Sequence, residues 1–179
     1  MPMRIVALAL AVAVLSSCAT QSVRESQYNL GVEAYKAKDY AAARLHWSHA
    51  IDAGELSAFN NLGYLLYQGL GGPTDRGRAV SLWQEAAFRG HSEAQWHLGQ
   101  AHEEGDAVPR SVVEAYAWYR CAVASAEATS QADEVEAQIL VDARKSLTDL
   151  LQNLPADQFG AAEGLARRYI GRYAKKAGA

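Results

Sequence analysis

The sequence predicts an all-α protein in which helix hairpins stack into a solenoid. Three observations lead to this prediction: a period of 36 residues, helical spacing of apolar residues within each period, and turn-forming residues between them. Similarity at a fixed period of roughly 20 to 50 residues is the sequence signature of a repeat architecture. One helix hairpin cannot bury its apolar face alone, so we expect neighbouring hairpins to stack.

The period is visible as an aligned triplet of a small, an aromatic and a second small residue. It occurs as Ala43/Trp47/Ala50, Ala79/Trp83/Ala86 and Ala115/Tyr119/Ala122. This spacing places each triplet on one face of a helix. We therefore expect the alanines to let a neighbouring helix approach, and the aromatic ring to fill the space between hairpins.

Residues that suit helix ends flank these triplets. Asp39, Asp75 and Ser111 lie four residues before them, where a side-chain oxygen can accept a hydrogen bond from an unpaired backbone N–H group. Gly54 and Gly90 follow the first two triplets and suit the left-handed position after a helix. Each triplet is therefore predicted to lie on the second helix of a hairpin. We call the first helix of each hairpin helix A and the second helix B.

Residues 58–122 resemble two copies of the Sel1-like repeat. The family pattern is Ala, then Leu-Gly, a Gly-containing loop, Asp, Ala-x-x-x-aromatic-x-x-Ala-Ala and Gly. The sequence has Leu62-Gly63, Asp75 and the segment 79–90 at these positions. The resemblance implies a right-handed superhelical solenoid of antiparallel helix hairpins, which serves as a protein-protein interaction scaffold and not as an enzyme.

The solenoid is predicted to occupy residues 27–127 and to be closed by a pair of helices in residues 128–176. Its repeats are 27–57, which is shortened and closer to a tetratricopeptide repeat, 58–93 and 94–127. The closing helices carry one apolar stripe each, Val135/Ile139/Ala143/Leu147/Leu150/Leu154 and Phe159/Ala162/Ala166/Tyr169/Ile170/Tyr173. A solenoid needs such a cap because its last repeat would otherwise expose an apolar face.

Residues 1–17 have the features of a secretory signal. Arg4 precedes a short apolar run, and Leu15-Ser16-Ser17-Cys18 follows it. That motif resembles the bacterial lipobox, which implies cleavage before Cys18, a lipid on that residue, and a polar tether at 18–26. An ordinary signal peptide with a chance cysteine is the alternative.

The resemblance to a lipobox also implies a location. Ala19 follows the predicted lipidated cysteine, where Asp often marks retention in the inner membrane. The expectation is therefore a secreted protein anchored by lipid to the outer membrane and facing the periplasm. If Cys18 is acylated, Cys121 is the only free thiol. It aligns with His49 and Glu85, which predicts a helix-surface or interface position and not the deep core.

Composition and motifs favour binding over chemistry. The formal net charge of -3 gives no electrostatic basis for nucleic-acid binding. The sequence contains no recognisable catalytic motif, and we expect no cofactor. His46 and His49 could share a helix face, but no third metal ligand is evident, so we expect no metal.

The predicted binding surface lies on the A helices, opposite the side that carries Ala58 and Leu62. Helical spacing places one row of side chains there, which we call the A-helix ridge: Tyr28, Val32, Tyr35, Asn60, Tyr64, Tyr67, Trp96, Gln100 and Glu103. Tyr and Trp favour interfaces because they combine an apolar body with a polar tip. The alternative is that these rings pack between successive A helices.

Three functions remain open at this stage. The first is a lipid-anchored envelope scaffold that binds a protein or peptide through the A-helix ridge. The second is a structural envelope protein that binds peptidoglycan or another glycan. The third is a cell-wall or β-lactam hydrolase, because a cysteine-rich branch of Sel1-like proteins has been associated with β-lactams. The repeats of that branch carry paired cysteines, and this chain has none.

Overall fold

The structure is a computed structural model that describes Ser22, residues 26–129 and residues 134–174. Within these ranges the chain contains helices and no strand, which confirms the all-α prediction. The predicted signal segment 1–17 and the predicted lipid-carrying Cys18 lie outside the described residues. No helix in the described ranges is both long enough and apolar enough to cross a membrane.

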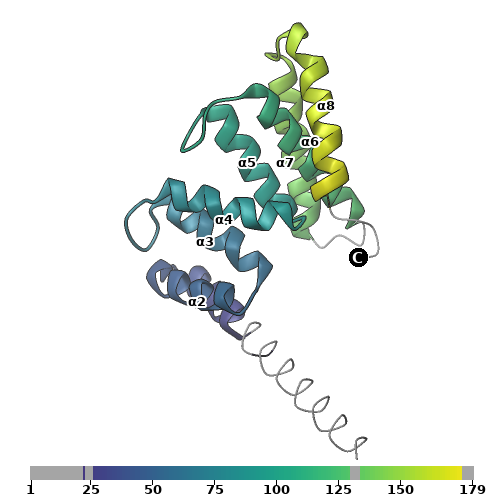
Figure 1. The fold of residues 1–179 in the computed structure, drawn as a ribbon. Coiled ribbons are helices and arrows are strands. Elements are labelled where there is room, and N and C mark those ends of the chain that lie inside the picture. The colour runs from purple at the N-terminus through teal and green to yellow at the C-terminus, as the bar shows by residue number, and fades with distance from the viewer. Residues whose placement is uncertain (1–21, 23–25, 130–133, 175–179) are drawn as a thin grey trace, which may run out of the picture.

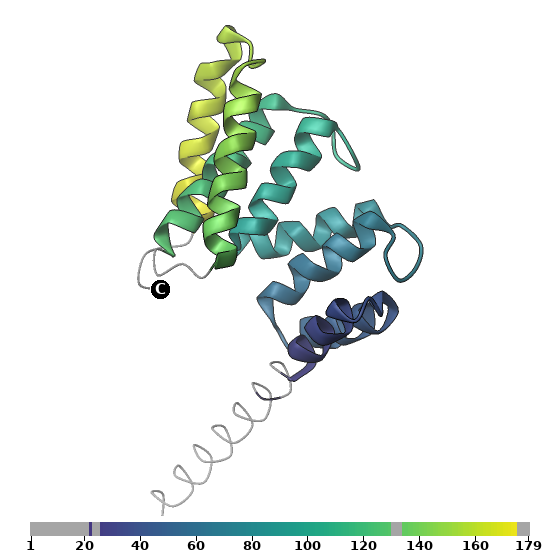
Figure 2. The same ribbon diagram turned by 180° about the vertical axis from the view of Figure 1, so that it is seen from behind.

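The helices pair in sequence order and stack in one direction (Figures 1 and 2). A helical segment at residues 26–36 precedes α2 (Tyr40–Asp52), α3 (Leu56–Gln68), α4 (Arg76–Phe88), α5 (Ser92–Glu104), α6 (Val112–Ala128), α7 (Glu134–Leu151) and α8 (Ala156–Tyr173). The first six form three hairpins, so the segment 26–36, α3 and α5 are the A helices. Both α7 and α8 pack against α6 at the far end of the stack.

The predicted helix caps are present. The Asp39 carboxylate accepts a hydrogen bond from the backbone N–H of Ala42, and that of Asp75 from the N–H of Arg78, each at 3.0 Å. In the third repeat, the Ser111 hydroxyl accepts a hydrogen bond from the backbone N–H of Glu114 at 3.2 Å. Gly54 and Gly90 have φ angles of 87° and 88°, the left-handed conformation that glycine adopts at little cost.

The aromatic residue of each helix B lies against a glycine of the preceding helix A. The pairs are Gly31 with Trp47, Gly63 with Trp83, and Gly99 with Tyr119. A Cβ atom on Gly63 would lie 2.6 Å from Trp83 Nε1, which is too close for any side chain. The same indole N–H donates to the backbone carbonyl of Asn60 at 3.2 Å. The Leu-Gly pairs of the sequence are therefore the places where helix A admits the ring.

The core consists of the alanines and aromatic rings of the triplets. All nine triplet residues are at most 3% exposed. In the closing pair the buried part of each stripe is shorter than predicted. Ile139, Ala143 and Ala166 are buried, whereas Val135 and Phe159, at the starts of the two stripes, are 61% and 44% exposed.

The prediction that Cys121 lies outside the deep core is wrong. Its side chain is fully buried in a cluster with Leu98 and Trp118, against which Tyr169 and Tyr173 of α8 pack. The closing helices cover a face of α6 that the equivalent B helices leave open, and repeat alignment cannot reveal this. Burial raises the pKa of the Cys121 thiol to about 12, so it is not a reactive thiolate at neutral pH.

The substitution Gly63→Ala tests the contact between glycine and ring. We expect it to lower the free energy of unfolding by about 1–3 kcal/mol, because a well-packed core must shift to admit the added methyl group. Gly160→Ala is the matched control, because a Cβ on this helical glycine meets nothing within 4 Å. The control should stabilise the protein by about 0.5–1 kcal/mol. Urea unfolding followed by circular dichroism measures both; equal stability of Gly63→Ala and wild type would contradict the packing.

Candidate functional site

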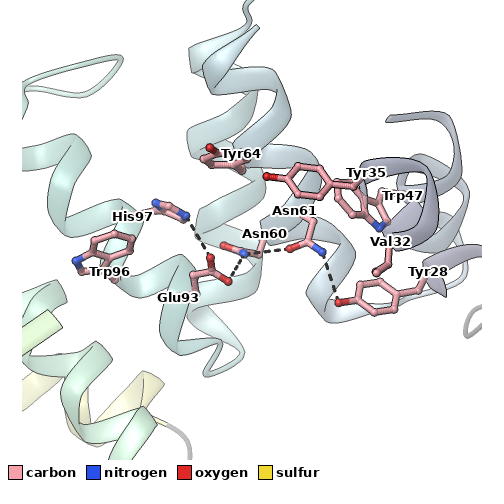
Figure 3. Close-up of a pocket in the computed structure, with 10 residues that line it drawn as sticks. All are labelled: Tyr28, Val32, Tyr35, Trp47, Asn60, Asn61, Tyr64, Glu93, Trp96 and His97. Atoms are coloured by element: carbon pink, nitrogen blue, oxygen red, sulfur yellow. Dashed lines mark hydrogen bonds and ion pairs between the residues drawn. The ribbon is translucent and has the colours of Figure 1, made fainter. Parts of the chain in front are cut away.

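The A helices and one ring from α2 line an open cavity of about 480 Å³. We call it the A-helix cavity; Figure 3 shows the side chains that line it. They are Tyr28, Val32, Tyr35, Trp47, Asn60, Asn61, Tyr64, Glu93, Trp96 and His97. Most of the lining is aromatic, with a small number of amide and carboxylate groups, which is the composition of many ligand-binding cavities.

The structure brings most of the A-helix ridge together around this cavity. Six of its nine residues line it: Tyr28, Val32, Tyr35, Asn60, Tyr64 and Trp96. Tyr67 and Gln100 instead line an adjoining hollow of about 280 Å³, which shares Tyr64, Trp96 and His97 with the cavity. Glu103 lines neither, because its carboxylate accepts a hydrogen bond from the hydroxyl of Tyr119 at 2.7 Å.

The ridge residues differ in how far they are open to solvent. Asn60 is only 1% exposed, whereas Tyr35 is 37% exposed. Tyr64 and Trp96 are half-buried, and the indole N–H of Trp96 donates to the hydroxyl of Ser146 on α7 at 3.0 Å. Tyr67 packs on Trp83 with ring centroids 5.1 Å apart. Tyr28, Tyr35, Tyr64 and Trp96 are therefore the aromatic residues of the ridge that line the cavity without being fully buried.

A chain of polar side chains crosses the cavity from one A helix to the next. The Asn60 amide donates to Glu93 Oε2 at 2.8 Å and to Asn61 Oδ1 at 3.3 Å. The Asn61 amide in turn donates to the hydroxyl of Tyr28 at 3.5 Å. These contacts fix the orientation of the Asn60 amide, and they leave its Oδ1 buried without a hydrogen-bond donor.

His97 forms part of the cavity wall as a neutral ring. It stacks on Trp83 with centroids 4.6 Å apart and planes at 19°, and its Nδ1 lies 3.2 Å from the side-chain oxygen of Gln100. Burial lowers the pKa of His97 to about 4, so the imidazole is uncharged at neutral pH. Its Nε2 lies 3.8 Å from Glu93 Oε1, which is too long for a hydrogen bond.

Glu93 supplies the formal negative charge of the cavity. Burial raises the pKa of this carboxyl group, and the nearby carboxylate of Glu136 raises it further, while the hydrogen bond from Asn60 acts in the opposite direction. None of the residues that line the cavity is Lys or Arg. The cavity therefore has aromatic walls and an acidic group that has no cationic partner among its lining residues.

Sequence reasoning missed four of the lining residues: Trp47, Asn61, Glu93 and His97. Helical spacing contains a signal for one of them, because Glu93 lies one turn before Trp96 on the same face of the helix. Extending the ridge by one turn would have included it. Trp47 enters from α2, and no spacing within the A helices could have revealed that.

The described residues show no arrangement for metal binding. No group of three or more His, Cys, Asp or Glu side chains in the described ranges comes together to hold a metal ion. The two neighbouring histidines of α2 are no exception, because His46 Nδ1 pairs with the side-chain oxygen of Gln27 at 3.0 Å. What the arrangement can do is bind, through aromatic faces, amides and one carboxylate.

The stacked hairpins define a helical repeat protein whose A helices line an aromatic cavity. The Sel1 repeat model matches the chain three times, at residues 24–54, 57–91 and 92–126. These matches cover more than half of the chain, and the chain belongs to the Sel1 repeat family. Proteins of this family commonly serve as protein-protein interaction scaffolds and are typically not catalytic.

Solved structures agree with this assignment. One similar structure is a protective antigen present in uropathogenic Escherichia coli strains, which displays an SLR fold, with a TM-score of 0.75 and 28% identity. That match covers 92% of this chain but only 33% of the antigen. A Sel1 repeat protein from Oxalobacter formigenes matches with a TM-score of 0.59 and 26% identity, over 83% of this chain and 64% of that one. No curated protein matches significantly in sequence.

The low pKa of His97 predicts a loss of stability in acid. The unfolded chain takes up a proton near pH 6.5, whereas the folded chain resists it until about pH 4. Stability is therefore fully present above pH 6.5 and falls by up to about 3 kcal/mol as the pH drops toward 4. In His97→Gln, the free energy of unfolding should change less with pH over this range. Urea unfolding at several pH values measures this dependence. Replacing the exposed His49 by Gln should leave the pH dependence of stability as in wild type. If His97→Gln also leaves it unchanged, the loss of stability in acid does not come from His97.

Proposed function

We propose that the protein is a lipid-anchored envelope scaffold that holds a protein or peptide partner in the A-helix cavity. The observation that carries the proposal is the gathering of ridge residues around one cavity on the A helices. Aromatic residues that are half-buried before a partner binds are typical anchors of protein interfaces. The scaffold role common in the Sel1 repeat family supports the same function.

The anchor rests on the N-terminal sequence. The apolar segment and Leu15-Ser16-Ser17-Cys18 support secretion, cleavage before Cys18 and acylation of that residue. Several acyl chains on one cysteine hold a protein at a membrane far better than a single chain does. In this proposal the solenoid works on the periplasmic side of the outer membrane, close to the surface that carries the lipid.

The hydrolase alternative has little support in the described residues. The repeats lack the paired cysteines of the branch associated with β-lactams. The remaining thiol, Cys121, is fully buried with its pKa raised. Turnover of a chromogenic β-lactam by the purified protein, with saturation kinetics, would support a hydrolase despite these observations.

A glycan is the second candidate ligand, because aromatic faces beside amide and carboxylate groups also suit a sugar ring. The A-helix cavity offers such a combination in Tyr64, Trp96 and Asn61. Co-sedimentation with purified sacculi that persists at high salt would favour a glycan over a protein partner.

Removing a ring from the cavity should weaken partner binding without unfolding the protein. We expect Tyr64→Ala or Trp96→Ala to reduce the partners recovered by crosslinking in intact cells, because each ring supplies contact area worth about 2 kcal/mol or more at an interface. Phe159→Ala is the matched control, because this ring is exposed on α8, outside the cavity. Circular dichroism checks the fold. Undiminished recovery, or an equal loss of helix content, would contradict the assignment.

Cys18→Ser tests the anchor. Without the thiol no lipid can be attached, so the variant should accumulate as unprocessed precursor or appear in the soluble fraction. Cys121→Ala removes the other cysteine and should leave the protein in the membrane fraction. The readout is fractionation followed by immunoblotting, with metabolic labelling by a fatty acid. Membrane association of Cys18→Ser equal to that of wild type would rule out the lipid anchor.

A further inference from the structure

The hollows of the A-helix face carry charge of one sign. Among the described residues, the A-helix cavity and the two smaller hollows beside it are lined by no Lys or Arg, although the chain contains 17 of these residues. Each hollow has at least one carboxylate, from Glu93, Glu104 or Glu136. A ligand that fills this face therefore meets a negative potential, which attracts cations and repels acidic groups.

Two buried acceptor atoms add to the potential at Glu93. Asn60 Oδ1 and His97 Nε2 are buried and have no hydrogen-bond partner; the orientation of each group follows from its neighbours. The Asn60 amide nitrogen is committed to Glu93 and Asn61. With Nδ1–H of His97 directed at the oxygen of Gln100, Nε2 carries a lone pair. Figure 3 shows the side chains of Asn60, Glu93 and His97 turned toward one another.

These two atoms lie beneath the surface of the cavity, so their lone pairs act through space and not by direct contact with solvent. The third unpartnered buried atom of the lining is a donor, Trp47 Nε1. It lies against Gly31, on the opposite side of the cavity from His97 in Figure 3. The unsatisfied polar atoms around Glu93 are therefore all acceptors, and their partial negative charges add to the attraction of a cation in the cavity.

The aromatic residues of the lining suit the same kind of ligand. Tyr64 and Trp96 line the cavity together with Glu93, and the hydrogen bond to Ser146 holds the Trp96 ring in place. The face of an aromatic ring attracts an ammonium or guanidinium group that lies within about 6 Å of its centre. A cation beside Glu93 would thus have aromatic rings around it as well as a carboxylate.

We propose that the A-helix cavity binds a Lys or Arg side chain of the partner, with its ammonium or guanidinium group beside the Glu93 carboxylate. The proposal rests on the proposed function, since it names the partner chemistry of the same site. An apolar side chain would cover Glu93 without neutralising it, and a buried unpaired charge is costly. An acidic side chain would be repelled by the same carboxylate. Burial and the nearby Glu136 carboxylate raise the pKa of Glu93, and a cation beside the carboxylate would lower it again.

The experiment uses the full chain purified in detergent and a random-peptide library displayed on phage. Enriched peptides are synthesised, and their affinities are measured by fluorescence polarisation. We expect them to share a Lys or Arg, and we expect replacement of that residue by norleucine to weaken binding at least about tenfold, as loss of a charge-assisted hydrogen bond does. This replacement leaves the protein unchanged, so the test does not depend on how any variant folds.

Protein variants then locate the basic residue. Glu93→Gln should weaken the same peptides at least about tenfold, because Gln keeps the length of the side chain but not the charge. In Glu93→Gln, replacing the basic residue of the peptide by norleucine should cause little further loss of affinity. Glu85→Gln is the matched control, because Glu85 is exposed on α4 and lines none of the three hollows.

The outcomes separate the two proposals. Peptides that depend on Tyr64 and Trp96 but have no basic anchor, or that bind Glu93→Gln as well as wild type, would overturn the cation site and leave the scaffold function standing. Peptides that bind Tyr64→Ala and Trp96→Ala as tightly as wild type would place recognition elsewhere and overturn both. A basic residue that the enriched peptides share, and whose replacement weakens binding to wild type but not to Glu93→Gln, supports the cation site.

Discussion

Each repeat depends on one close contact, in which the aromatic residue of helix B lies against a glycine of helix A. At Gly63 and its two equivalents no other residue fits, because a Cβ atom would overlap the ring. The contact brings the two helices of a hairpin together, and the alanines around the ring admit the next helix. A core built of alanine and single large rings is sensitive to added volume, because protein interiors are close-packed.

The cavity follows from the same contact. When the B helices pack through their rings, the A helices become neighbours and present one face each to a common space. That space is lined by six ridge residues, and Trp47 closes it from α2. One ring therefore serves both the core of the first hairpin and the wall of the cavity. Changes that disturb hairpin packing will also alter the A-helix cavity.

The closing helices do more than cover an apolar end. Helix α8 buries Cys121 and packs tyrosines against Trp118, while α7 supplies the hydroxyl of Ser146 that orients Trp96. The last repeat thus differs from the others in environment, although its sequence follows the same pattern. The acidic character of the hollows also depends in part on α7, which contributes Glu136.

The sequence by itself determined the repeat helices, their predicted caps and the buried triplets, because these follow from spacing within one or two turns and from the period between repeats. It also placed most of the A-helix ridge on one side, since helical periodicity is local. Only the tertiary structure decided that His97 and Trp47 join the cavity, that Glu103 turns to Tyr119, and that Cys121 is buried. These features depend on contacts between helices far apart in the chain, which no single repeat encodes.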